Sequence, residues 1–173
     1  KNNSFVLVFN GEIYNHWNIR KSFLNKFNIN WEGTSDTETL LKSIEFLGIE
    51  KSLNLLEGMF AFAFYDKLKK KLYLARDKFG EKPLFYGVVN NSFVFGSELK
   101  IFSRFPNFKK KISTDALSLF LKYSYVPEPY SIYEKVFKVR PGEYLEINLN
   151  EVNIHNVLSI NNIKKFKWYK PVY

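Results

Sequence analysis

The first apolar run of the chain predicts a strand, and the segment after it predicts a helix. Residues 5–9 are β-branched and aromatic, which is typical of a buried strand. Asn10-Gly11 follows, and we expect the strand to end there. From Ile13 to Phe27 the apolar positions recur at helical spacing. This period favours a strand-to-helix turn at Asn10-Gly11 over the hairpin that an Asn-Gly pair otherwise indicates.

A second helix is predicted over residues 35–47. Ser35 and Glu38 have the spacing of a capping box, in which Ser35 accepts from the Glu38 amide and Glu38 reaches back. Apolar residues then recur at helical spacing until Gly48, which we expect to end the helix. Residues 51–56 predict one more short helical piece.

After Gly58 the pattern changes to short apolar runs separated by turn residues, which predicts an antiparallel meander of three hairpins with strands at 59–65, 72–75, 84–89 and 93–95. These strands are apolar on both faces, unlike the strands of a half-solvated sheet. Each face must therefore be covered. We expect the helices at 13–27 and 35–47 to cover one face and another sheet or more helices to cover the other.

The last third of the chain predicts a helix, a hairpin and a polar tail. The helix spans residues 113–123, and the hairpin joins 136–139 to 144–149 through Pro141-Gly142. Residues 152–158 predict one further strand. From Ser159 to Tyr173 the chain is rich in Lys and Asn and is typical of a linker.

Composition excludes several classes of protein. The 173 residues are 46% hydrophobic, and this fraction argues against a disordered chain. No cysteine is present, which excludes a disulfide scaffold, a zinc ribbon or a thiol nucleophile within these residues. His16 and His155 are too few for a metal cluster, so we expect no metal site. No apolar run has the length of about 20 residues that a membrane helix needs, and no secretory leader is visible.

The net charge of +9 leaves a basic nucleic-acid binder open as an alternative, although we expect no nucleic-acid partner. The lysines of this chain are scattered along the sequence, apart from triplets at 69–71 and 109–111 that are typical of solvated turns. A nucleic-acid binder tends to gather charge on one face, and would bind DNA or RNA in a strongly salt-dependent way.

Two positions have both a structural and a chemical interpretation. At the end of a rigid strand, the Asn10 amide and the Gly11 N–H could point the same way, as the two donors of an oxyanion hole do. Asp36 lies in the first turn of a predicted helix, where an acidic residue favours the helix dipole, and it could also pair with a ligand's ammonium group. Arg76-Asp77 is interpreted as structural.

Taken together, five ordered motifs resemble the glutamine-hydrolysing asparagine synthases. They are Phe9-Asn10-Gly11-Glu12-Ile13-Tyr14-Asn15, Thr34-Ser35-Asp36-Thr37-Glu38, Gly58-Met59-Phe60-Ala61-Phe62-Ala63, Ala75-Arg76-Asp77-Lys78-Phe79-Gly80-Glu81-Lys82-Pro83-Leu84-Phe85-Tyr86 and Gly96-Ser97-Glu98-Leu99-Lys100. Val126-Pro127-Glu128-Pro129 and Arg140-Pro141-Gly142 fit the end of that family's glutaminase domain. The resemblance covers roughly residues 5–150.

The resemblance implies an α+β fold of the N-terminal-nucleophile hydrolase type, an αββα sandwich of two antiparallel sheets that is incomplete at its N-terminus. It implies a class II glutamine amidotransferase whose cysteine nucleophile attacks the side-chain amide of L-glutamine and releases ammonia. Carried over by motif, Asn10 and Gly11 form the oxyanion hole. Glu12 and Asp36 hold the amino-acid end of glutamine, and Asp36 pairs with the α-ammonium. Neither Arg20 nor Arg76 is expected to bind the substrate carboxylate.

The resemblance also implies a division of the chain and a larger parent protein. A partial glutaminase domain is expected over residues 1–156, and a linker with the start of a synthetase domain over 157–173. ATP and magnesium belong to the absent synthetase domain, and this segment is expected to hold no cofactor. The family's Met-Cys start is also absent. We therefore expect the chain alone to be inactive and poorly stable, its parent to be cytoplasmic, and a homodimer to be one open assembly.

Besides the basic nucleic-acid binder, two alternatives remain open. One is a non-catalytic relative that keeps the fold as an interaction module. A catalytically inactive pocket, however, has no need for four substrate contacts. The other is a similar amidotransferase that acts on a carboxylate other than aspartate.

Overall fold

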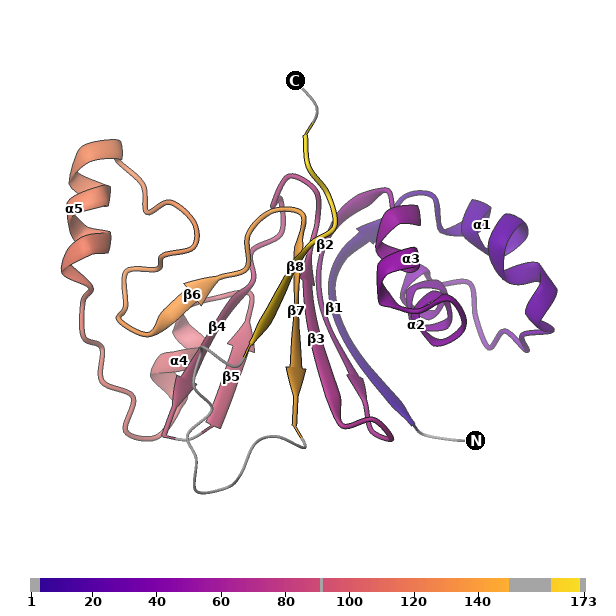
Figure 1. The fold of residues 1–173 in the computed structure, drawn as a ribbon, viewed down its shortest axis with the longest axis horizontal. Coiled ribbons are helices and arrows are strands. Elements are labelled where there is room, and N and C mark those ends of the chain that lie inside the picture. Colours follow the sequence, from indigo (N-terminus) through magenta and orange to yellow (C-terminus); the bar gives the residue numbers. More distant parts are fainter. Residues whose placement is uncertain (1–3, 91, 150–162, 172–173) are drawn as a thin grey trace.

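The computed structural model describes residues 4–90, 92–149 and 163–171, which form two antiparallel sheets with helices outside them (Figure 1). The larger sheet has the order β1-β2-β3-β7-β8, with bounds Phe5–Ile13, Gly58–Asp66, Lys71–Arg76, Glu143–Asn148 and Lys164–Lys167. The smaller sheet has the order β5-β4-β6, with bounds Ser92–Gly96, Phe85–Val89 and Val136–Lys138. Every strand pairing is antiparallel.

Helical segments lie on both outer sides of the paired sheets. Against the larger sheet lie α1, η1, η2, α2 and α3, with bounds His16–Ile19, Arg20–Leu24, Asn25–Phe27, Asp36–Leu47 and Ile49–Leu55. Against the smaller sheet lies α4 (Lys100–Arg104), while α5 (Thr114–Tyr123) stands apart at the far side of Figure 1. The layers therefore follow the predicted order of helices, sheet, sheet and helices. None of the helices in the described ranges is long and apolar enough to cross a membrane.

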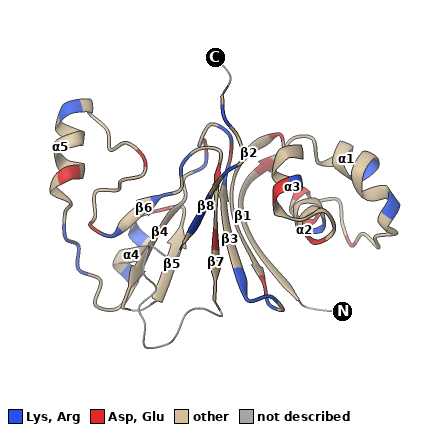
Figure 2. Cartoon of the chain, in the orientation of Figure 1, with Lys and Arg blue, Asp and Glu red and all other residues tan. Residues whose placement is uncertain are grey.

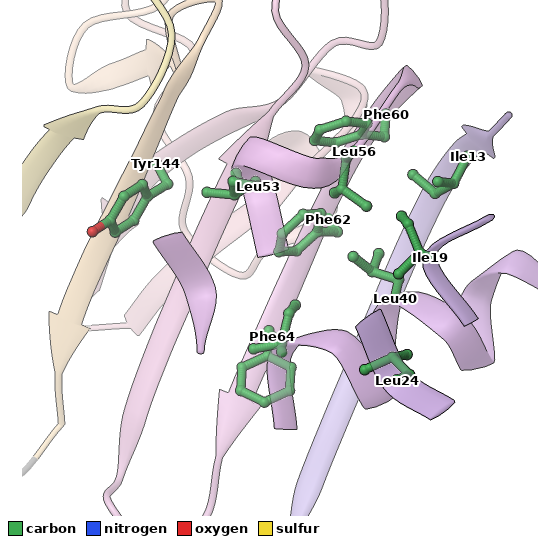
Figure 3. Packing of buried hydrophobic residues seen from close by; sticks show 12 residues of the cluster. Ile13, Ile19, Leu24, Leu40, Leu53, Leu56, Phe60, Phe62, Phe64 and Tyr144 are labelled. Carbon is green, nitrogen blue, oxygen red and sulfur yellow. The ribbon is translucent and has the colours of Figure 1, made fainter. Parts of the chain in front are cut away.

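Strand β2 shows how the two faces of the larger sheet differ. Its residues Phe60, Phe62 and Phe64 point toward the helices, where they pack with Leu40 and Leu53 in a closed cluster (Figure 3). The residues between them, Ala61 and Ala63, belong to a second cluster that the smaller sheet covers. Large rings on one face and small methyl groups on the other let the second sheet approach closely.

The second cluster confirms the prediction that both apolar faces of these strands are covered, here by a second sheet. In this cluster the larger sheet contributes Leu72, Leu74 and Leu145. They are buried together with Tyr86 of β4 and with Leu84, which directly precedes that strand. Burial raises the pKa of Tyr86 to about 12, because the phenolate form is poorly solvated there.

The first strand is longer than predicted, and the expected turn at Asn10-Gly11 is wrong. Pairing of β1 with β2 continues to Ile13 opposite Gly58, and the Tyr14 N–H then donates to the Glu57 carbonyl oxygen at 2.8 Å. The helix predicted over 13–27 begins only at His16 and is broken into α-helical, π-helical and 3₁₀ turns.

The predicted helix at 35–47 is confirmed as α2, with the Ser35 hydroxyl accepting from the Glu38 N–H at 3.2 Å and Gly48 at its end. The carboxylate of Glu38 reaches further back than a capping box predicts. It accepts from the N–H groups of Glu32 at 2.8 Å and Gly33 at 3.0 Å. The predicted short helix is α3, and α5 matches the helix predicted at 113–123.

Two predicted hairpins are crossovers between the sheets. β3 lies in the larger sheet and β4 in the smaller, so residues 77–84 do not close a hairpin. The predicted continuous meander is therefore wrong at this point, while its other two hairpins, β2–β3 and β4–β5, are confirmed. In the same way β6 pairs with β4 while β7 pairs with β3, so Pro141-Gly142 joins two sheets. Lys164–Lys167 lies in the predicted linker but forms strand β8. The strand predicted at 152–158 falls outside the described residues.

Candidate glutamine site at the edge of strand β1

The backbone N–H groups of β1 point in two alternating directions. At its two ends, the Lys67 N–H donates to the Ser4 carbonyl oxygen and the Tyr14 N–H donates to the Glu57 carbonyl oxygen, each at 2.8 Å. Even-numbered residues therefore form the hydrogen-bonded pairs with β2. The N–H groups of Gly11 and Ile13 point away from β2, toward an edge that has no strand partner in the described part of the chain.

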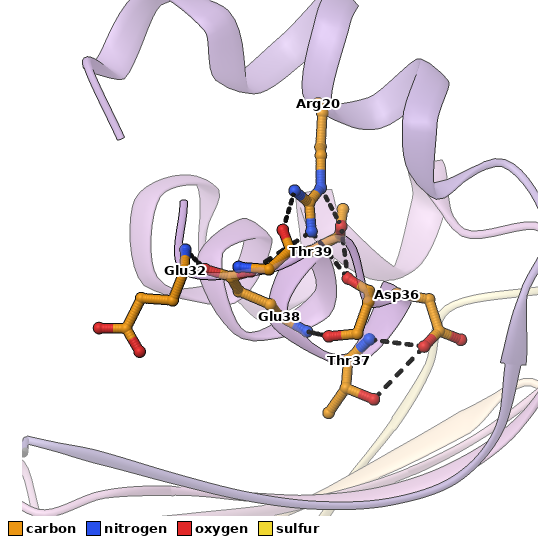
Figure 4. Close-up of polar contacts among 8 residues, drawn as sticks. Arg20, Glu32, Asp36, Thr37, Glu38 and Thr39 are labelled. Atoms are coloured by element: carbon orange, nitrogen blue, oxygen red, sulfur yellow. Dashed lines mark hydrogen bonds and ion pairs between the residues drawn. The ribbon is translucent and has the colours of Figure 1, made fainter. Parts of the chain in front are cut away.

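Asp36 occupies this edge beside Ile13. Its Oδ2 accepts from the Ile13 N–H at 2.9 Å. Its Oδ1 accepts from the Thr37 N–H at 2.7 Å (Figure 4). The side chain is half-buried in the first turn of α2, where an acidic residue interacts favourably with the helix dipole. The Thr37 Oγ1 donates a third bond to Oδ1 at 3.3 Å. Since a carboxylate has about four acceptor positions, about one is left for a ligand's ammonium group.

Gly11 precedes Ile13 by two strand residues, which is a displacement of about 7 Å along the edge. The Gly11 N–H, which has no acceptor among the residues that the structure describes, and the carboxylate of Asp36 are therefore separated along one sheet edge by about the length of two strand residues. One end of this edge offers a hydrogen-bond donor and the other offers a negative charge.

Asn10 and Glu12 lie on the face of β1 that is turned toward the smaller sheet. They alternate with Gly11, and both are exposed. The Asn10 Nδ2 donates to the Ser97 Oγ at 3.0 Å, while the Glu12 side chain makes no hydrogen bond or ion pair to any residue that the structure describes. Four of the described cavities, including one of about 660 Å³ beside Trp17 and Trp31, are lined by other residues than Asn10, Gly11, Glu12 and Asp36.

Arg20 shapes the loop that leads to Asp36, a role that sequence reasoning missed. Its guanidinium is buried, with a side-chain exposure of 7%, and it stacks over the Trp31 ring at 3.8 Å. It donates to Thr39 Oγ1 at 2.7 Å and to the carbonyl oxygens of Gly33 at 2.9 Å and Ser35 at 2.8 Å (Figure 4). Because these partners are mostly main-chain atoms, the sequence carries no signal for them. The bonds fix the chain immediately before Asp36.

Arg76 and Asp77 are structural, and they hold the connection between the sheets. Arg76 donates to the carbonyl oxygens of Gly80, Lys82 and Val139. Asp77 is fully buried, and its carboxylate accepts from four backbone N–H groups, those of Phe60, Phe79, Glu81 and Lys82, at 2.9 to 3.2 Å. Neither side chain is directed to the edge of β1 by these contacts.

Metal ligation has no candidate among the described residues, where no group of three or more His, Asp or Glu side chains is arranged to hold an ion. The site is instead one of backbone donors, a carboxamide and carboxylates. Such a set binds a small polar molecule that carries both an ammonium group and an oxygen acceptor.

Residues 1–157 match the family model of a glutamine amidotransferase domain. A candidate glutamine-hydrolysing asparagine synthetase of Methanocaldococcus jannaschii is 36% identical over 97% of this chain and 31% of its own length. Glutamine-hydrolysing asparagine synthetases 3 and 1 of Bacillus subtilis are 34% and 37% identical over 95% and 83% of this chain, and 26% and 22% of their own lengths. The chain thus spans less than a third of these relatives.

Solved structures of similar architecture show the fold. A glutamine phosphoribosylpyrophosphate amidotransferase from Bacillus subtilis superposes with a TM-score of 0.64 at 21% identity, over 99% of this chain and 31% of that chain. A class II glutamine aminotransferase domain protein from Silicibacter pomeroyi superposes with a TM-score of 0.53 at 15% identity, over 95% of this chain and 67% of that one. The two-sheet sandwich is therefore the architecture of glutamine amidotransferases.

Proposed function

The chain belongs to the class II glutamine amidotransferase domain family, and from this premise we propose that it is the glutamine-binding part of a glutamine-hydrolysing asparagine synthetase. Two relatives that match 97% and 95% of its length carry that name, at 36% and 34% identity. The parent protein then uses ATP and magnesium in a separate synthetase domain, and the ammonia released from glutamine amidates aspartate there.

The observation that carries this proposal is the alignment of donor and carboxylate along the edge of β1. Glutamine lies along this edge with its α-ammonium at Asp36, where the carboxylate has about one acceptor position left. Its side-chain carbonyl oxygen lies at the other end, between the Gly11 N–H and the Asn10 carboxamide. Glu12, which is exposed on the same face as Asn10, assists at the amino-acid end.

The reaction needs a nucleophile from outside these 173 residues, which contain no cysteine. A thiolate adds to the side-chain amide carbon, and the negative charge passes to the amide oxygen. As this intermediate collapses, the proton that the thiol gave up passes to the nitrogen, ammonia leaves and a glutamyl thioester remains. Water then hydrolyses the thioester to glutamate and regenerates the thiol. Donors preorganised at the developing oxyanion lower the barrier, and each is worth roughly 10²- to 10³-fold in rate. The isolated chain is accordingly inactive.

Substitution of Asp36 in the full-length protein tests the proposal. Because Asp36 binds the ammonium of glutamine and nothing in the synthetase reaction, Asp36→Ala should raise the KM for glutamine while ammonia-dependent synthesis persists. Asp115→Ala is the matched control, since this carboxylate also lies in the first turn of a helix but on the remote α5. Equal loss of the glutamine- and ammonia-dependent activities would contradict the assignment.

Three finer points belong to the same proposal. The parent protein acts in the cytoplasm, its acceptor is aspartate, and its partner within the chain is the synthetase domain. A parent that hydrolyses glutamine but amidates a different carboxylate would keep the site and change only the acceptor. Product analysis with each acceptor in the presence of ATP separates these two cases.

A further inference from the structure

We propose that Ser97 is a positioning residue that orients the Asn10 carboxamide for glutamine hydrolysis. The inference rests on the proposed function, because it gives the oxyanion-hole role of Asn10 a physical support. It adds a residue that lies in the other sheet and does not touch the substrate.

The contact joins two parts of the chain that are far apart in sequence. Asn10 lies in β1 of the larger sheet, and Ser97 directly follows β5 of the smaller sheet. The Nδ2 of Asn10 donates to the Ser97 Oγ at 3.0 Å. Among the described residues this is the one hydrogen bond of the Asn10 side chain, which is otherwise exposed. The orientation of the carboxamide therefore depends on this hydroxyl.

Ser97 is held firmly enough to act as a reference point. On one side, Gly96 pairs with Phe85 at the end of the β4–β5 hairpin. On the other side, the turn of α4 begins, and Phe102 of this helix is completely buried against the smaller sheet. A Cβ at position 96 would lie 2.4 Å from the Ile101 Cδ1, so the chain before Ser97 packs tightly on α4.

The chemistry needs the nitrogen end of the carboxamide, not its oxygen. The amide nitrogen carries two hydrogens, so donation of one to Ser97 leaves the second for an oxyanion. Without the hydroxyl, the amide can rotate and present its carbonyl oxygen, which repels developing negative charge. Ser97 thus fixes, before the reaction begins, the orientation of a donor that acts mainly in the transition state. Loss of Ser97 should therefore affect kcat more than KM.

An isosteric pair of variants in the full-length protein tests the inference. Ser97→Thr keeps the hydroxyl, and Ser97→Val has nearly the same shape without it. We expect Ser97→Val and Ser97→Ala to lower the glutaminase kcat by about tenfold, the effect of one hydrogen bond, with little change in the KM for glutamine. Ser97→Thr should restore most of the rate. Ammonia-dependent synthesis should be unchanged in all three variants, and Ser103→Ala in α4 is the control.

A double-mutant cycle with Asn10→Ala separates positioning from a merely structural contact. If Ser97 acts through Asn10, the Asn10→Ala/Ser97→Ala protein should be no slower than Asn10→Ala alone. The inference would be overturned if the double variant lost the product of the two single-variant rate factors. Equal rates for Ser97→Val and Ser97→Thr would also overturn it. Full glutaminase activity of Asn10→Ala would instead overturn the proposed site itself, so the two failures are distinguishable.

Discussion

Gly11 occupies a position where a side chain cannot be accommodated. Its φ is +149°, and a Cβ there would lie 2.1 Å from the Met59 carbonyl oxygen and 2.7 Å from the Phe60 Cα. We expect Gly11→Ala to separate β1 from β2 locally, to cost about 3 kcal/mol and to abolish glutaminase activity. Thermal unfolding and glutamine hydrolysis of the full-length protein measure both effects.

Gly33→Ala provides the comparison for that substitution. The nearest atom to a Cβ at Gly33 is the Glu38 Oε2 at 3.8 Å, an ordinary contact. This variant should keep both stability and activity. An unaffected Gly11→Ala protein would show that the pairing of β1 with β2 adapts at this point, and would remove the geometric basis of the site.

At the scale of residues, the sequence predicts which side chains belong to the candidate site but not how they are held. The ordered motifs predict Asn10, Gly11, Glu12 and Asp36, and the structure brings all four to one end of β1. The contribution of Arg20 could not be predicted, because two of its partners are the carbonyl oxygens of Gly33 and Ser35. Main-chain acceptors have no signature in a single sequence.

At the scale of elements, capping residues predict both ends of α2 well, while strand connections are predicted poorly. The Ser35 cap and the Gly48 end of α2 follow from residue type alone. The 77–84 connection contains the Gly and Pro residues of a hairpin turn, yet it carries the chain from one sheet to the other. The feature that distinguishes this crossover from a hairpin turn is the buried Asp77 carboxylate. Its four N–H donors come from its own loop and from β2.

Removal of this carboxylate should therefore loosen the junction of the sheets. Asp77→Ala leaves one buried and three partly buried N–H groups without their acceptor, and the expected loss of stability is about 3 kcal/mol. Asp115→Ala, on the exposed α5, should cost little. The shift in unfolding midpoint of the full-length protein measures the difference, and equal shifts for the two variants would argue against a central role for Asp77.

The pairing of β3 with β7 makes stability sensitive to alkaline pH. Tyr73 lies opposite Glu146 in this pair, and burial, then the Glu146 charge, raises the pKa of Tyr73 to about 12. In the unfolded chain a tyrosine loses its proton near pH 10. The contribution of Tyr73 is thus fully present below pH 10 and is lost as the pH rises from about 10 to 12.

Tyr73→Phe should therefore flatten the fall in the free energy of unfolding between pH 10 and about 12. Tyr144 should contribute a similar fall, since burial and its hydrogen bond to Glu50 also raise its pKa. Urea unfolding at a series of pH values measures the slope. The exposed Tyr123→Phe is the control, and the same slope in wild type and Tyr73→Phe would contradict the linkage.

At the scale of the whole molecule, the four-layer order could be predicted because the strands are apolar on both faces. The division of strands between two sheets could not, since an apolar run fits either sheet. The two edges of the larger sheet also differ in a way that only the assembled fold reveals. β8 presents the exposed Lys164, Lys165 and Lys167 (Figure 2), whereas β1 carries the exposed Val6 and Val8.

Lysines on an edge strand oppose pairing with another chain, and an apolar edge invites it. With exposures of 42% at Val6 and 59% at Val8, and no strand partner for β1 in the described ranges, we expect the isolated 173-residue chain to self-associate through β1. Val8→Lys should reduce this association, as measured by light scattering over a range of concentrations. Leu68→Lys adds the same charge at a 77% exposed residue of the β2–β3 turn, outside β1. If both variants reduce association equally, net charge rather than the β1 edge governs it.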